Sequence, residues 1–240
     1  RFWPALDAFA LSLSRWNLVG KRQYIGLANY DRLVHDPVFW QVLGNTFEYL
    51  LLGLPVSLVL SFLIAFQLDR VAYGNALLRA LYFLPHLTTA TAMAWVWRWF
   101  YQPAPIGVFN GWLTALGFAQ QPFLRSTTQA LPAVLAPAIW AALGFQIIIF
   151  MAGLKAIPRS YYEAAEIDGA GFWQTLREIT LPLLLPSFVF LLITTSIGLL
   201  RIFDQVYNMT DGGEGGPLNA TKPLVLSIYQ SAFARMDMGF

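Results

Sequence analysis

Long apolar stretches alternate with short polar ones along most of the 240-residue chain. A membrane-spanning helix requires about 20 consecutive, mainly apolar residues, and complete stretches of this kind lie at residues 42–66, 77–100, 130–154 and 179–200. A partial stretch occupies residues 2–13, and apolar character builds again after Phe233. Because lipid offers no partner for backbone amide groups, such segments are expected to be helices. The sequence therefore predicts an all-α, polytopic transmembrane helical bundle, with about six spans in the full chain.

A polar insertion at residues 158–180 separates the last two complete stretches. Pro158 is expected to stop the preceding span. Ser160 and Glu163 have the spacing of a capping box, which predicts a short helix that begins at Ser160. One side of this helix would carry an apolar contact face made of Tyr161, Tyr162, Ala165 and Ile167.

Glycines are expected to end that short helix. Gly169 and Gly171 allow a sharp turn, and a second helix at residues 172–179 then leads to Pro182, which a helix tolerates near its start. Without further information, the whole insertion is also typical of an ordinary amphipathic connector that lies on the membrane surface.

Composition narrows the class of protein. Hydrophobic residues make up 57% of the chain and charged residues only 12%, with a mean hydropathy of +0.54, whereas soluble domains carry about a quarter charged residues. The net charge of +2 gives no reason to expect a nucleic-acid partner. The absence of cysteine excludes disulfides, thiolate metal sites and cysteine nucleophiles. His35 and His86 are far apart in the sequence and make a poor metal-binding set.

The polar insertion carries a spaced motif. Glu163-Ala164-Ala165 is followed by three residues and Gly169, and after nine more by Ile179, Leu181 and Pro182. This spacing resembles the EAA loop of bacterial ABC importer permeases, which have the type I importer fold. In that family the loop forms a cytoplasmic coupling helix that docks on a separate ATPase subunit. The resemblance implies that the docking residues here are Glu163, Ala164, Ala165, Asp168 and Gly169.

The resemblance extends along nearly the whole chain. Segments similar to carbohydrate importer permeases are YIGLANY at 24–30, DPVFW at 36–40, RALYFLP at 79–85 and FDQVYNMTDGG at 203–213. They resemble the first of the two permease subunits in the carbohydrate and glycerophosphodiester branch. The resemblance implies a multi-pass protein of the bacterial inner membrane that imports a small mono-, di- or oligosaccharide. Its implied partners are the lipid bilayer, a second homologous permease, two ATPase subunits and an extracytoplasmic substrate-binding protein.

ATP hydrolysis is expected on another chain. A P-loop needs G-x-x-x-x-G-K-[ST], whereas Gly20-Lys21 is followed by Arg22 and lacks the first glycine at the required position. We therefore expect no enzyme activity and no cofactor in this chain, with ATP and Mg bound by the partner ATPase. One alternative keeps the architecture and imports glycerol 3-phosphate or its diesters. Another is a polytopic membrane transferase, although the acidic residues gather on the insertion.

A saccharide pocket needs uncharged polar groups and aromatic rings that face a cavity. In the family, the pocket draws on the spans before and after the loop. The matching positions are Thr91, Phe145, Thr195, Gly198, Leu199 and Ile202, with Gln146, Thr194 and Ser196 as nearby polar alternatives. Threonine and serine hydroxyls in membrane helices often bond to their own helix backbone instead, so that both roles stay open for these residues.

Two ionisable residues lie within predicted spans. Glu48 is a functional candidate because a carboxylate in a membrane is costly, although near Trp40 it can also reach water. His86 is expected to bond to a carbonyl freed by Pro85.

The direction of insertion follows from the resemblance alone. Counting Lys and Arg in the loops places residues 158–180 outside the cell, whereas the resemblance places them in the cytoplasm, and we follow the resemblance. We expect residues 1–240 to form a single transmembrane permease domain with a coupling loop at about 158–180. The chain opens on Arg1 without a Met, and we expect it to be a fragment with incomplete terminal spans.

Overall fold

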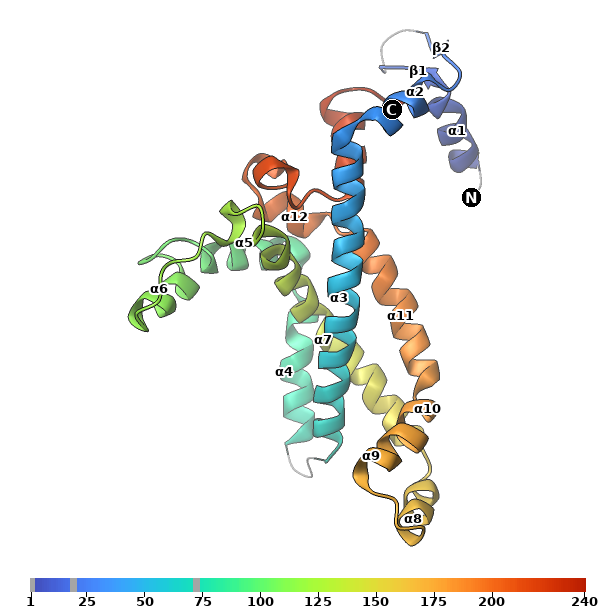
Figure 1. The fold of residues 1–240 in the computed structure, drawn as a ribbon, viewed down its shortest axis with the longest axis vertical. Coiled ribbons are helices and arrows are strands. Elements are labelled where there is room, and N and C mark those ends of the chain that lie inside the picture. Colours follow the sequence, from blue (N-terminus) through green and yellow to red (C-terminus); the bar gives the residue numbers. More distant parts are fainter. Residues whose placement is uncertain (1–2, 18–20, 71–73) are drawn as a thin grey trace.

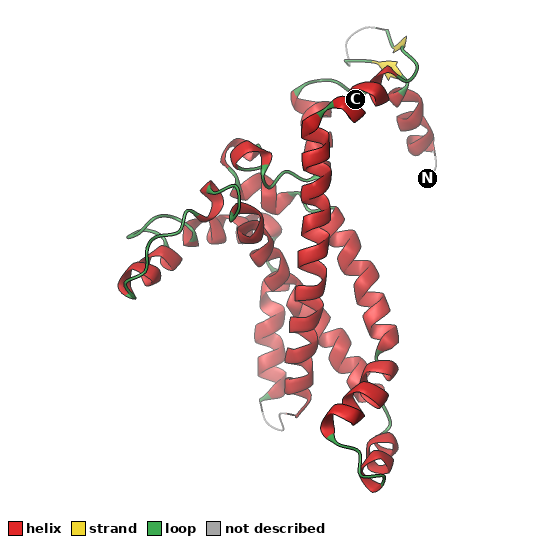
Figure 2. Ribbon diagram, in the orientation of Figure 1, coloured by secondary structure: helices red, strands yellow, loops and turns green. Residues whose placement is uncertain are grey.

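The computed structural model describes residues 3–17, 21–70 and 74–240. The all-α bundle expected from the sequence is confirmed: the described chain is mostly helical, as Figure 2 shows. The strands in this part of the chain are β1 (Ser14–Arg15) and β2 (Gln23–Tyr24), which pair antiparallel. This small sheet was not expected from the sequence.

Two long helices form the centre of the bundle. α3 (Pro37–Arg70) has 34 residues and α7 (Ala130–Ala156) has 27, and both are long and apolar enough to cross a membrane. They confirm the spans expected at 42–66 and 130–154. Each continues through an internal proline, Pro55 in α3 and Pro137 in α7.

The single span expected at residues 77–100 is wrong. This stretch divides into α4 (Asn75–Leu87) and α5 (Ala90–Phe100), and α5 runs away from the bundle direction (Figure 1). Thr88 is extended, and the side chain of Thr89 accepts a hydrogen bond from the Ala92 amide as the N-cap of α5. A capping threonine pair therefore starts a new helix inside an apolar run, which hydropathy alone does not reveal.

The span expected at residues 179–200 is also interrupted. α9 (Phe172–Thr175), a π-helical turn (Leu176–Thr180) and α10 (Leu181–Leu183) lead into α11 (Leu185–Leu200), with a bend of 62° at the break. Pro186 is the second residue of α11, where it removes an amide donor to the preceding turn. Sharp helix bends are usually found at prolines or π-bulges, and both are present here.

Close helix contacts depend on glycine. α7 packs against α3 and α4, and α11 packs against α3. A Cβ on Gly144 of α7 would overlap the carbonyl oxygen of Tyr82 in α4. A Cβ on Gly53 of α3 would meet the Leu135 side chain at 2.9 Å and that of Leu199 at 3.0 Å. Small residues thus allow these helices to approach, as transmembrane packing requires.

Buried side chains form two clusters along the bundle. The loop-side cluster includes Phe62 of α3, Phe150 of α7 and Leu191 of α11. The distal cluster includes Tyr49 of α3, Val134 of α7 and Val206 of α12 (Asp204–Met209). Many large apolar side chains of α3 and α11 are exposed instead, for example Leu51 and Ile193. Such exposure fits helices that face lipid or other helices rather than water.

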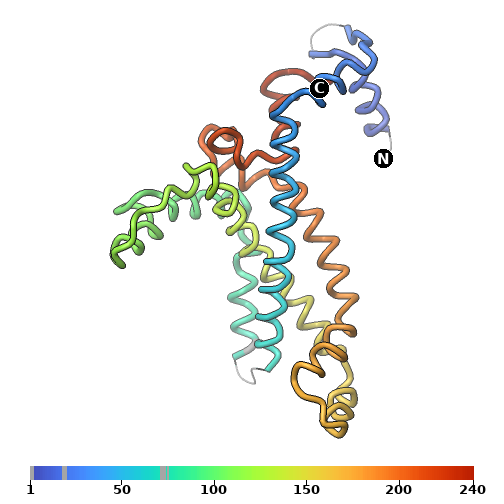
Figure 3. The backbone as a smooth tube through the Cα atoms, viewed as in Figure 1, coloured from blue at the N-terminus to red at the C-terminus, as the bar shows by residue number. Residues whose placement is uncertain are grey.

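Both termini lie at the end of the molecule opposite residues 158–180 (Figure 3). The N-terminal elements are α1 (Trp3–Ser12) and α2 (Ala28–His35). α6 (Val108–Ala115) lies on an arm that projects sideways from the bundle (Figure 1). A 3-10 turn (Phe123–Arg125) follows it in the chain. Two further 3-10 turns (Asp211–Gly213, Pro217–Asn219) precede α13 (Leu224–Tyr229), which continues as a π-helical turn (Gln230–Ala234).

The terminal apolar segments differ from expectation. α1 has only 10 residues, and Phe2, where the partial span was expected to begin, lies outside the described residues. The C-terminal apolar helix begins at Leu224 rather than after Phe233.

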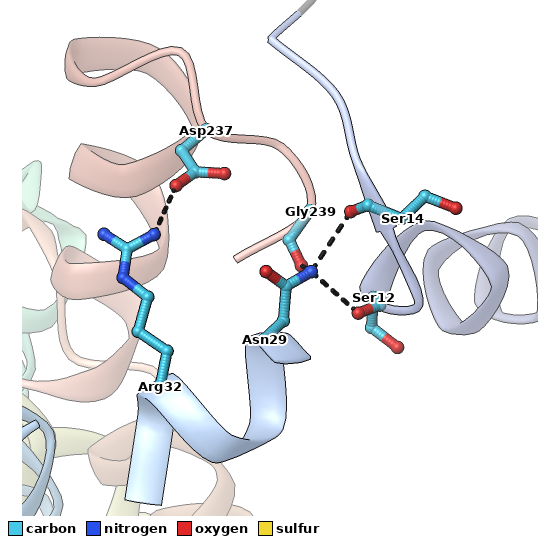
Figure 4. Close-up of polar contacts among 6 residues, drawn as sticks. All are labelled: Ser12, Ser14, Asn29, Arg32, Asp237 and Gly239. Carbon is cyan, nitrogen blue, oxygen red and sulfur yellow. Dashed lines mark hydrogen bonds and ion pairs between the residues drawn. The ribbon is translucent and has the colours of Figure 1, made fainter. Parts of the chain in front are cut away.

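A polar junction joins the two terminal regions (Figure 4). The Asn29 side-chain amide donates to the carbonyl oxygens of Ser12 at 2.8 Å, Ser14 at 3.1 Å and Gly239 at 2.8 Å. Arg32 also pairs with Asp237 at 2.9 Å.

Candidate functional site

The coupling loop, residues 158–180, forms the end of the molecule opposite both termini, and α8 (Arg159–Ile167) is its first helix (Figure 1). The capping box expected at Ser160 is wrong. Pro158, in extended backbone, is the N-cap, and no side chain caps the helix. Because the helix begins directly after the proline, Ser160 already lies in its first turn. Pro158 thus both follows the end of α7 and directly precedes α8.

The end of α8 follows the expectation. Gly169 has φ +75, its amide donates to the Glu166 carbonyl at 3.1 Å, and the Ala170 amide donates to the Ala165 carbonyl at 2.9 Å. This pair of bonds is the Schellman motif, which favours glycine at the left-handed position. A Cβ on Gly169 would meet no atom within 4 Å. Glycine is therefore required by the backbone angle rather than by space.

The motif residues of α8 are mostly exposed. Glu163, Ala164, Asp168 and Gly169 all face outward, whereas Ala165 is buried at 8% exposure. The expected apolar contact face is divided. Ala165 and the half-buried Tyr162 face the chain's own helices, whereas Tyr161 and Ile167 are exposed, the latter at 86%. A single face made of all four residues is therefore wrong, because a helix held against the bundle buries one side.

The rest of the motif attaches the loop to the bundle. Ile179 and Leu181 are half-buried, and Leu181 packs against the loop-side cluster, whereas Pro182 is exposed. The hydroxyl groups of Tyr162 and Thr180 lie 3.3 Å apart, and Thr180 is buried.

The coupling loop also contacts the end of α3. The ring of Phe172 lies 5.9 Å from that of Phe66. The Arg70 guanidinium lies 4.3 Å from the centre of the Phe66 ring and 5.2 Å from that of Phe172. The loop is thus in contact with α3 and with the turn that leads into α10 and α11.

The second candidate site is a cavity whose lining includes residues from both buried clusters. This central cavity has a volume of about 310 Å³ and is lined by His86, Ala138, Ala142, Phe145, Gln146, Thr194, Thr195, Gly198, Leu199, Ile202 and Gln205. The structure thus brings together seven of the candidate pathway residues: Phe145, Gln146, Thr194, Thr195, Gly198, Leu199 and Ile202. Thr91 on α5, Glu48 on α3 and Ser196 on α11 are described residues that lie outside this lining. Thr91 is displaced because α5 diverges after Thr89.

Polar groups in the central cavity are few and differ in their bonding. Gln146 is 1% exposed, and its Nε2 donates to Thr195 Oγ1 at 3.0 Å and to Ser57 Oγ at 3.4 Å. Its Oε1 is buried and has no hydrogen-bond partner among the described residues. The Thr194 hydroxyl donates to the Phe190 carbonyl of its own helix at 2.9 Å. Gln146 therefore offers the cavity an unused acceptor, while Thr194 is satisfied locally.

His86 bonds differently from expectation. Its Nδ1 lies 3.1 Å from the Ala141 carbonyl on α7, and its ring stacks on Phe145 at 5.6 Å and 17°. The carbonyl freed by Pro85 is on α4 itself, so the expected partner is wrong. His86 helps to join α4 and α7 beside the cavity.

Sequence reasoning missed three other lining residues: Ala138, Ala142 and Gln205. The spacing of Ala138, Ala142 and Phe145 places them on one helix face, which could have indicated the two alanines. Within the described residues, no group of three or more His, Asp or Glu side chains is placed to hold a metal ion.

Comparison with known proteins gives consistent matches. The family described as "Binding-protein-dependent transport system inner membrane component" matches residues 37–235. A probable ABC transporter permease protein of Pyrococcus horikoshii is 33% identical over 237 residues, covering 96% of this chain and 78% of that protein. The lactose transport system permease protein LacF of Rhizobium radiobacter is 35% identical over 240 residues, covering 98% of this chain and 78% of that protein.

A solved structure has the same fold. It is the crystal structure of a bacterial alginate ABC transporter in complex with an alginate pentasaccharide-bound periplasmic protein. The TM-score is 0.83 and the sequence identity 24%, with 99% of this chain and 80% of that chain covered. At this identity the likeness bears on the fold alone.

Proposed function

The chain belongs to the family of binding-protein-dependent transport system inner membrane components, and from this premise we propose that it forms half of the pore of an ATP-driven saccharide importer. It is a membrane permease component of the ABC transporter type, and a membrane transferase is set aside because the family is a transporter component. The proposal places the chain in the bacterial inner membrane as a multi-pass subunit.

The observation that carries the proposal is the exposed end of α8. Glu163, Ala164 and Gly169 are presented at one end of the bundle, and the helix that carries them is tied to the bundle behind it. We propose that this surface docks on a separate ATPase subunit. Closure of the ATPase would then move the coupling loop as one body, because Tyr162 and Phe172 connect it to the loop-side cluster and to α3. Rigid-body motion around a central site is how many transporters alternate access.

The central cavity supports the choice of substrate class. Its volume of about 310 Å³ lies at the lower end of the range for small-molecule pockets. The lining combines an aromatic ring, Phe145, with the uncharged polar groups of Gln146 and Thr195. Aromatic faces accept the C–H side of a sugar ring, and uncharged amides and hydroxyls suit its hydroxyl groups. The lactose permease relative agrees with a saccharide.

The remaining partners follow from the same proposal. A second homologous permease would complete the pore and the cavity, two ATPase subunits would bind ATP and Mg, and an extracytoplasmic binding protein would deliver the saccharide. Exposed apolar side chains on α11, such as Leu185 and Ile193, are available for a helix partner or for lipid.

The test reverses one charge on the docking surface. Glu163→Lys is expected to abolish ATP-driven saccharide uptake by the assembled transporter in proteoliposomes, while capture of the saccharide by the binding protein persists. The matched control is Glu178→Lys, which reverses an exposed carboxylate in the same loop but outside α8, and it is expected to retain uptake. Full uptake by the Glu163→Lys transporter would remove the coupling role.

A further inference from the structure

A larger cavity lies at the end of the molecule opposite the coupling loop. This distal cavity has a volume of about 510 Å³ and lies between the glycine-rich turns that follow α12 and the helix that begins with α13. The central cavity and the coupling loop use none of its residues. Its size falls within the range of small-molecule pockets.

Lys222 lines this cavity although it is only 5% exposed. Its Nζ donates to Asn219 Oδ1 at 3.3 Å, which is a neutral acceptor. Across residues 3–17, 21–70 and 74–240, the ion pairs of the structure involve other residues, so no carboxylate pairs with Lys222. Burying a charge is costly unless an opposite charge or several hydrogen bonds compensate it. Two of the three ammonium donors therefore remain for a ligand.

Charged side chains of both signs lie near Lys222. Arg235 also lines the cavity. Burial, and after it the positive charge of Arg235, lowers the pKa of the Lys222 ammonium, while Glu214 and Asp36 raise it. Glu214 lines the cavity as well, so that an anion is favoured at the lysine and disfavoured at this carboxylate.

Hydrogen bonds from α3 hold the backbone around Lys222 in place. The Asn45 side-chain amide of α3 donates to the carbonyl oxygens of Lys222 at 3.0 Å and Asn219 at 2.7 Å. The Tyr49 hydroxyl donates to the Thr221 carbonyl at 2.9 Å. These bonds from a spanning helix hold the lysine in place, and a pre-organised group loses less entropy when a ligand binds.

Aromatic rings form another wall of the cavity. The rings of Tyr207 and Tyr229 meet at 82° with centres 5.9 Å apart, and Phe233 lies 5.2 Å beyond Tyr229. Beside them, the Gln230 amide is held by a bond from its Nε2 to the Gly213 carbonyl at 3.0 Å. The cavity thus joins flat apolar surfaces to a buried cation.

We propose that the distal cavity binds a small polyol that carries one anionic group, a sugar carboxylate or a phosphate ester, with Lys222 as its anion ligand. The rings of Tyr207, Tyr229 and Phe233 contact the carbon skeleton of the polyol, while the Lys222 ammonium donates its two unused hydrogen bonds to the anionic group. This assignment rests on the proposed function, in which this end of the chain faces the side from which substrate arrives.

The test measures binding without ATP. The assembled transporter, prepared in nanodiscs without its binding protein, is titrated calorimetrically with D-glucuronate, glycerol 3-phosphate and D-glucose at equal ionic strength. At least one of the two anions is expected to bind more tightly than glucose. Lys222→Met is expected to weaken that binding about tenfold or more, the amount that a charge-assisted hydrogen bond contributes. The matched control is Lys155→Met, which removes an exposed lysine in the last turn of α7. It is expected to leave the three affinities unchanged.

Each outcome decides the assignment. Binding of glucuronate alone identifies a carboxylate ligand, and binding of glycerol 3-phosphate alone identifies a phosphate ester. Equal binding of all three probes, or affinities that Lys222→Met leaves within about twofold, would overturn the assignment. So would a lower unfolding temperature of the Lys222→Met protein, since removing an uncompensated buried charge is expected to keep or raise it. Because no ATP is hydrolysed, failure here is independent of the Glu163→Lys uptake test.

Discussion

Replacing Gln146 with leucine tests whether its buried amide serves the central cavity rather than the stability of the bundle. The substitution removes hydrogen bonds to Thr195 Oγ1 at 3.0 Å and Ser57 Oγ at 3.4 Å, and each neutral bond contributes about 0.5–1.5 kcal/mol net. It also removes the unpartnered Oε1, whose burial costs about 1–3 kcal/mol. These effects oppose each other. The free energy of unfolding is therefore expected to change by no more than about 1 kcal/mol.

Uptake is expected to respond more strongly than stability. If a saccharide hydroxyl donates to Gln146 Oε1, the Gln146→Leu transporter loses one neutral hydrogen bond to substrate. Its apparent substrate affinity in ATP-driven uptake is then expected to fall about two- to tenfold. The matched control is Ser57→Ala, which removes the longer of the two bonds to Gln146 and the bond from Ser57 Oγ to the Leu54 carbonyl of its own helix. It keeps the Gln146 amide and is expected to leave uptake unchanged.

Two results would refute this reasoning. The unfolding midpoint of the Gln146→Leu protein is expected to stay within about 4 °C of the parent protein, since about 1 kcal/mol shifts it by 2–4 °C at this size. A much larger drop would show that the amide mainly holds α3, α7 and α11 together. Unchanged uptake would show that its free acceptor does not meet the substrate.

Three further changes test other parts of the account. Gly169→Val places a β-branched residue at φ +75, a strain of about 1–3 kcal/mol. ATP-driven uptake is expected to fall while the binding protein still captures saccharide, with Gly171→Val, at extended backbone, as the control; equal uptake by both would contradict the turn's role. Gly144→Ile should lower the unfolding midpoint by the equivalent of about 1–3 kcal/mol because no Cβ fits at the α4–α7 crossing. Gly44→Ala, with open space around it, should not, and a stable Gly144→Ile protein would show that the helices can separate. Tyr162→Phe removes one hydroxyl contact between α8 and the π-helical turn that precedes α10 and α11. The change should raise the number of ATP molecules hydrolysed per saccharide imported; an unchanged ratio argues against this contact as a link.

The coupling loop was largely predictable because its features are local. A glycine at the left-handed position and the residues before it decide where α8 ends, and the sequence places Gly169 there. The predicted start of α8 is wrong because Ser160 and Pro158, two residues apart, both favour a helix start in the same turn. Pro158 became the N-cap, and Ser160 entered the helix.

The hydropathy pattern could not predict where helices break inside apolar stretches. Residues 77–100 are apolar enough for one span, yet Thr89 caps a new helix that departs sideways. Residues 179–200 bend by 62° at a π-helical turn followed by proline. Hydropathy measures burial in lipid and carries no information on helix direction, which local capping and proline decide.

The candidate cavity residues came from the family resemblance rather than from any local pattern. Seven of them line one cavity, because α7 and α11 face each other there. Thr91 and Glu48 do not, since α5 turns away and Glu48 lies on an exposed face of α3. The charge on Lys222 gave no signal in the sequence, because only the fold shows that it is buried without a carboxylate.

The central claim is that α8 docks on an ATP-hydrolysing partner. The chain has no cysteine, so Ala164→Cys introduces a single exposed thiol on α8 that can carry a thiol-specific photocrosslinker. In membranes that contain the assembled transporter, illumination is expected to join this site to the ATPase subunit, with a yield that changes when ATP is added. Ala119→Cys, exposed on the arm that carries α6, is expected to give no such product. Crosslinks from Ala164→Cys to lipid alone, or the same ATPase product from both sites, would contradict the account.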